Sequence, residues 1–71
     1  MVHTDVSDRS GHVQSVGYDP IQKQIEVRFQ NGYLYRGTAS PQRHRALMAA
    51  DSIGTYYHQH LKDSMSRVHG G

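Results

Sequence analysis

The stretch from Ile25 to Arg36, IEVRFQNGYLYR, constrains the fold more than any other part of the chain. Apolar and polar residues alternate strictly as far as Gln30, which is the pattern of a strand with one buried face. Asn31-Gly32 then interrupts the alternation, and Asn-Gly between apolar runs is the strongest short-range sign of a hairpin. The sequence therefore predicts two antiparallel strands joined by a two-residue loop.

A two-residue loop also predicts which side chains share a face of the hairpin, because it sets the register of the two strands. The core face would carry Ile25, Val27, Phe29 and Leu34. The opposite face would carry Glu26, Arg28, Gln30, Tyr33 and Tyr35. Two aromatic rings beside an arginine suit base stacking or partner binding. A three-residue loop would reverse this facing.

The length of 71 residues allows one domain. A chain this short buries only about 60% of its unfolded surface, so its stability is marginal. Only 35% of its residues are hydrophobic, and the absence of cysteine excludes disulfides and thiolate metal ligands. We therefore expect a homo-oligomer, in which a second copy covers part of the surface.

The charge of the chain is close to balanced, with a formal net charge of +2 at pH 7. This excess does not by itself indicate nucleic-acid binding, which goes with a denser basic stripe. No run approaches the roughly 18 apolar residues of a membrane span. The polar segment from Met1 to Ser10 does not resemble a signal peptide. We expect a cytoplasmic protein with no membrane partner.

Turn and cap signals predict how the chain is organised. A flexible N-terminal arm covers residues 1–12, a single domain covers 13–63, and a frayed tail covers 64–71. Strands are expected at 13–18, 24–30 and 33–38, and their short connections favour a meander. Ser40 and Pro41 suit the start of a helix, and Tyr57 and Leu61 mark one face of a second. The predicted fold is α+β: a three-stranded antiparallel sheet followed by two short helices packed on one face.

Several blocks of the sequence resemble the KTSC domain family. They are VGYDP from Val16, IEVRFQNG from Ile25, YLY from Tyr33 and LMAADSIGTYYHQHLK from Leu47. The family takes its name from a domain at the C-terminus of some lysyl-tRNA synthetases, and it also occurs as a small bacterial or phage protein. Its Tyr-x-Tyr landmark is matched by Tyr33 and Tyr35. The resemblance covers about Ser15 to Lys62 and implies an RNA-binding role. Arg43 and His44 depart from the apolar or aromatic residues usual at the helix start.

The candidate ligand-binding residues are Arg28, Tyr33, Tyr35, Arg36 and Arg43. The tyrosines would stack on a base, each ring contributing about 1–3 kcal/mol. Equally, one or both rings could pack under the helices or in an oligomer interface. A basic group of Arg36, Arg43, His44 and Arg45 spans the end of the third strand and the first turn of the first helix. This group favours a phosphate near Ser40 to Arg43, or is a solvated basic face beside an ordinary cap.

Metal binding and catalysis find little support in the sequence. His58 and His60 stand two residues apart, so on a helix they point about 200° from each other and cannot share an ion. The acidic residues are scattered, and no phosphate loop, nucleophile elbow or His-Glu-x-x-His motif is present. We therefore expect no metal, no cofactor and no enzymatic activity.

The sequence thus predicts a small binding module for RNA or a phosphorylated nucleotide, which it could sequester. The alternative is a protein-interaction module, such as a phage accessory protein that inhibits a host protein by binding it. The two hypotheses differ in what the tyrosines contact and in their response to salt.

Overall fold

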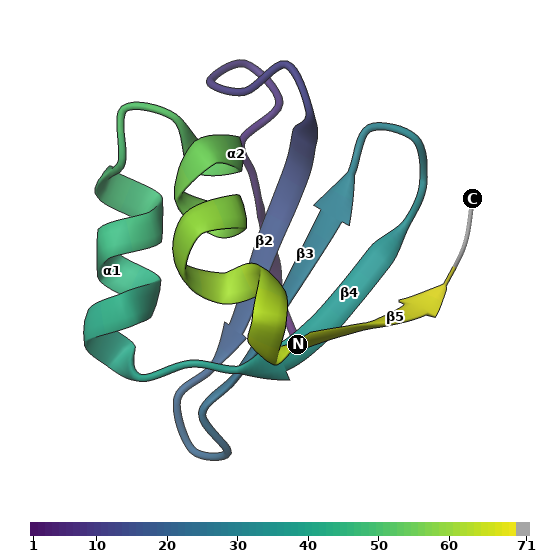
Figure 1. Cartoon of the computed structure of the whole chain (residues 1–71). Coiled ribbons are helices and arrows are strands. Elements are labelled where there is room, and N and C mark those ends of the chain that lie inside the picture. Colours follow the sequence, from purple (N-terminus) through teal and green to yellow (C-terminus); the bar gives the residue numbers. More distant parts are fainter. Residues whose placement is uncertain (70–71) are drawn as a thin grey trace.

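The computed structural model describes residues 1–69 as one antiparallel sheet with the helices on one face (Figure 1). The strands are β1 (His3–Asp5), β2 (Val13–Asp19), β3 (Gln24–Phe29), β4 (Leu34–Thr38) and β5 (Met65–His69). They lie in sequence order across the sheet, as a meander, and every neighbouring pair is antiparallel. The predicted α+β class and the helices on one face are confirmed.

The number of strands predicted from the sequence was wrong, because the sheet has five strands and not three. β1 comes from the segment predicted to be an arm, and β5 from the segment predicted to be a tail, of which residues 70 and 71 lie outside the described residues. Both extra strands are short edge strands with mostly exposed side chains. They therefore lack the apolar alternation that reveals a half-buried strand.

The helical segment follows β4 and begins where the cap signals indicate. α1 (Pro41–Ala49) has Ser40 as its N-cap, and the Ser40 hydroxyl accepts a hydrogen bond from the Arg43 backbone N–H. α2 (Ile53–Tyr56) is capped in the same way by Ser52. The chain then continues through the π-helical turn η1 (Tyr57–Leu61) and the short 3₁₀ turn η2 (Lys62–Ser64) into β5.

The core lies between the helices and the inner face of the sheet. Its buried side chains are Val6, Val13, Val16, Ile25, Val27, Ala39, Leu47, Ile53, Tyr57 and Leu61. Tyr18 joins β2 to the helical layer, since its hydroxyl donates to the Ala39 carbonyl and its ring stacks on His44 with 4.4 Å between centroids. Burial lowers the pKa of His44, and the charge of Arg45 lowers it further, so the fold favours the neutral form of the stacked imidazole.

Candidate ligand-binding site

The hairpin between β3 and β4 has a three-residue loop, made of Gln30, Asn31 and Gly32, instead of the predicted two-residue loop. The Phe29 N–H donates to the Tyr33 carbonyl at 2.9 Å, and the Gly32 N–H donates to the Phe29 carbonyl at 3.0 Å. Gly32 has a φ of 93°, the left-handed conformation that the last residue of such a loop needs.

The longer loop shifts the register by one residue and reverses the predicted facing. Tyr35 pairs with Val27, and Leu34 pairs with Arg28. Tyr33 and Tyr35 therefore lie on the inner face with Phe29, whereas Leu34 lies on the outer face. The prediction that Leu34 faces the core and that both tyrosines lie beside Arg28 was wrong.

Four aromatic rings gather where η1 crosses the inner face near the hairpin, and we call them the aromatic cluster: Phe29, Tyr33, Tyr35 and Tyr57. Their rings meet edge to face, with 5.1 Å between the centroids of Phe29 and Tyr57 and 5.5 Å between those of Phe29 and Tyr35. Tyr35 also approaches Tyr33 and Tyr57 at 6.5 and 6.3 Å. These are the separations and tilts that aromatic pairs prefer.

A pocket of about 380 Å³ opens against the aromatic cluster, and we call it the aromatic pocket. Besides the four rings it is lined by His12, Asn31, His58 and Lys62. Tyr57 is only 3% exposed. Burial, with a smaller effect from Tyr35, raises the pKa of Tyr57 to about 12. Its hydroxyl is therefore protonated near neutral pH.

Two cationic side chains lie close to the aromatic rings of this pocket. Arg67 of β5 lies over the Tyr33 ring, with its guanidinium carbon 5.1 Å from the ring centroid, within cation–π range. Lys62 lines the pocket at the end of the helical segment. Among the described residues that line the pocket, none is acidic. The pocket therefore combines aromatic rings with the positive charges of Lys62 and Arg67.

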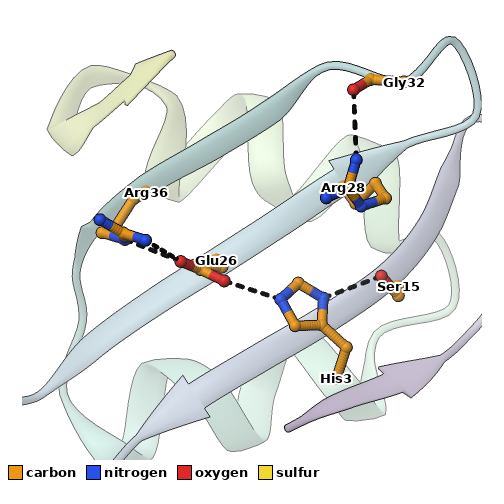
Figure 2. Close-up of polar contacts among 6 residues, drawn as sticks. All are labelled: His3, Ser15, Glu26, Arg28, Gly32 and Arg36. Carbon is orange, nitrogen blue, oxygen red and sulfur yellow. Dashed lines mark hydrogen bonds and ion pairs between the residues drawn. The ribbon is translucent and has the colours of Figure 1, made fainter. Parts of the chain in front are cut away.

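Two of the predicted site residues, Arg28 and Arg36, lie on the outer face (Figure 2). The register places Tyr33 and Tyr35 on the opposite face. Arg36 is committed to an ion pair with Glu26, to which its Nε donates at 2.7 Å. Arg28 reaches back to the hairpin, where its Nη1 lies 3.4 Å from the Gly32 carbonyl oxygen. Neither arginine can contribute charge to a ligand held by the aromatic cluster.

Glu26 is the centre of the outer-face network shown in Figure 2 and is only 6% exposed. His3 Nε2 lies 2.7 Å from one carboxylate oxygen of Glu26, and His3 Nδ1 lies 2.8 Å from the Ser15 hydroxyl. Burial by itself raises the pKa of Glu26, but the hydrogen bonds from His3 and Arg36 outweigh it and the pKa is lowered. The network holds β1, β2, β3 and β4 together.

Arg43, the last predicted site residue, lies at a different place, near the start of α1. It lines a polar hollow of about 450 Å³ with Lys23, Ser40 and His60. The structure thus brings Tyr33 and Tyr35 together but separates all three arginines from them.

The sequence interpretation missed most of the residues around the aromatic pocket. Phe29 was predicted only as a core residue, and Tyr57 only as part of one face of the second helix. His12 was assigned to the flexible arm. Arg67 lay in the predicted tail. The sequence signal that could have found them was the alternative three-residue loop, since it turns both tyrosines toward Phe29. Within residues 1–69, no three His, Asp or Glu side chains are arranged so that they could hold a metal ion.

The fold and the site thus define a small α+β domain. Helices cover one face of its sheet, and an aromatic pocket lies beside its hairpin. The model of the KTSC domain matches residues 9–64, and the chain belongs to this family. An uncharacterised protein of Stutzerimonas stutzeri (strain A1501) is 43% identical over 58 residues, which cover 80% of this chain and 82% of the relative.

The solved structure of a KTSC domain protein from Yersinia pestis has the same architecture. It superposes with a TM-score of 0.80 at 28% sequence identity, and the match covers 99% of this chain and 97% of that protein. No helix among the described residues is long and apolar enough to cross a membrane.

Proposed function

We propose that this protein is a non-enzymatic binding module whose aromatic pocket accepts the base of a nucleotide-containing ligand. The observation that carries the proposal is the combination of four aromatic rings with cationic and neutral polar side chains around one pocket. A volume of about 380 Å³ lies within the range of roughly 300–1,000 Å³ typical of small-molecule sites.

The charge around the pocket distinguishes between nucleotides and quaternary ammonium groups, two classes of ligand that aromatic pockets bind. Rings arranged edge to face also recognise quaternary ammonium groups. Here Lys62 and Arg67 stand at the rings, and they would repel a cationic guest. The same two side chains would attract the phosphate of a nucleotide whose base stacks on Tyr33 or Tyr35. The pocket therefore favours an aromatic ligand that carries negative charge.

The test is calorimetry with adenosine 5′-monophosphate and uridine 5′-monophosphate. Tyr33→Ala should weaken binding by about 1–3 kcal/mol, because it removes one stacking face. Lys62→Ala should also weaken binding. Arg45→Ala is its charge-matched control, since Arg45 is exposed on α1 and lines none of the described hollows, and it should leave the affinity unchanged.

Two results would overturn the proposal. One is the absence of heat with both mononucleotides and with single-stranded RNA. The other is an equal effect of Lys62→Ala and Arg45→Ala, because it would mean that net charge, and not the pocket, attracts the ligand. The first result would favour the alternative, a protein-interaction module.

A further inference from the structure

Two histidines that line the aromatic pocket are shared with a neighbouring hollow. His12 and His58 also line a neighbouring hollow of about 350 Å³, which we call the second hollow. It lies between the loop that leads into β2 and the start of α2, which meet at one end of the sheet (Figure 1). The two histidines therefore stand between two adjoining compartments, the aromatic pocket and the second hollow.

The second hollow is lined by two glycines that the fold does not require. At Gly11 and at Gly54, a Cβ atom would meet no heavy atom within 4 Å. Gly54 is the second residue of α2, where glycine costs up to about 1 kcal/mol relative to alanine. Neither residue has the positive φ that would favour glycine. Packing and backbone conformation thus leave both glycines unexplained.

The missing side chains leave open space in the hollow, the arrangement that lets a ligand backbone approach closely. Gly11 is exposed, whereas Gly54 is buried at the start of α2. The polar groups around the hollow suit a phosphodiester chain. Arg9 lines the hollow, and its Nη2 donates to the Met48 carbonyl at 2.7 Å and lies 3.5 Å from the Ala50 carbonyl oxygen. Within residues 1–69, its Nε and Nη1 have no hydrogen-bond partner. Thr55 also lines the hollow, beside Gly54. Among the described residues that line the hollow, Asp51 is the one carboxylate, and Arg9 and the two histidines are on the same lining.

We infer that the ligand is a single-stranded oligonucleotide that spans both compartments, with one base on the aromatic cluster and the adjoining backbone over Gly11 and Gly54. This inference rests on the proposed function, because it takes the aromatic pocket as the base site. It adds that the two compartments act as one groove, of which a mononucleotide fills only part. Affinity therefore depends on chain length, and the second hollow supplies that dependence.

The experiment compares uridine 5′-monophosphate with a tetrauridylate RNA and a tetrathymidylate DNA by calorimetry. The tetranucleotide should bind the wild-type protein at least about tenfold more tightly, a gain of about 1.4 kcal/mol. Gly54→Leu fills the second hollow with a side chain that favours helix. It should remove the gain and leave mononucleotide binding unchanged. Gly54→Ala is the control for the helix, and its melting temperature should not fall below that of the wild type.

Gly11→Gln fills the hollow from its other wall and replaces Gly54→Leu if the latter does not fold. The RNA and DNA probes show which sugar the groove prefers. If the mononucleotide binds but the tetranucleotides bind no more tightly, the inference is overturned and the proposed function stands. If neither filling variant changes the length dependence, the inference is also overturned. If neither probe class binds, the proposed function itself has failed.

Discussion

At the scale of single residues, Glu26 shows how a charge can be placed in a small sheet. Its carboxylate is nearly buried, and each of its oxygens has a cationic or hydrogen-bonding partner, Arg36 on one side and His3 on the other. A buried carboxylate without such partners would be strongly destabilising. The lowered pKa of Glu26 means that folding favours its ionised form.

This pKa predicts how stability depends on pH. The stabilisation by Glu26 is present above its ordinary pKa of 4.5 and is lost as the pH falls through the lower value of the folded state. Glu26→Gln should cost about 1–3 kcal/mol at pH 7, because it removes the charge that His3 and Arg36 share. The difference between the two proteins should shrink below pH 4.5. Urea unfolding from pH 3 to 7 measures it, and a difference that does not vary with pH would contradict the prediction.

At the scale of elements, the hairpin loop decides which face becomes a site. One additional residue in the loop turns Tyr33 and Tyr35 from the outer face to the inner face, where Phe29 and Tyr57 complete the aromatic cluster. Asn31-Gly32 predicts a hairpin correctly, but both two- and three-residue loops accept glycine at their last position. The local sequence therefore does not distinguish the two registers.

Two glycines give a matched test of this loop. Gly32→Ala should destabilise the protein by about 1–2 kcal/mol, since an L-residue pays that much in the left-handed conformation. Gly54→Ala, in a helix with ordinary φ and free space, should be neutral or stabilising by up to about 1 kcal/mol. Thermal melts of both variants measure the contrast. Equal shifts would mean that the turn is not the one described.

At the scale of the whole molecule, the five-stranded sheet draws core residues from outside the predicted domain. Val6, which follows β1, is 1% exposed and belongs to the core, and its N–H donates to the Gln14 carbonyl at 2.9 Å. Such a small domain has few core side chains to lose. β1 and β5 end the sheet with open edges, where a second copy could pair. The homo-oligomer stays a prediction.

The first residues are therefore expected to contribute to stability. Val6→Ala should cost about 1.5–3 kcal/mol, the contribution of a fully buried valine side chain. Val2→Ala is the control on the same segment, because Val2 is 89% exposed, and it should have no measurable effect. Chemical denaturation monitored by circular dichroism measures both. If the two variants behave alike, the segment is the flexible arm that the sequence suggested.

The sequence by itself determined the three central strands and the helix start at Ser40, and it singled out Tyr33 and Tyr35 as a pair. These features depend on local patterns: alternation, cap chemistry and an aromatic pair. The edge strands, the register of the hairpin and the cations around the aromatic pocket were decided only by the tertiary structure. Their contacts join residues far apart in the chain, as His3 joins Glu26 and Arg67 joins Tyr33. A one-residue difference in the length of a loop is small in sequence. It nevertheless moves every side chain of the following strand to the other face of the sheet, because side chains alternate with a period of two.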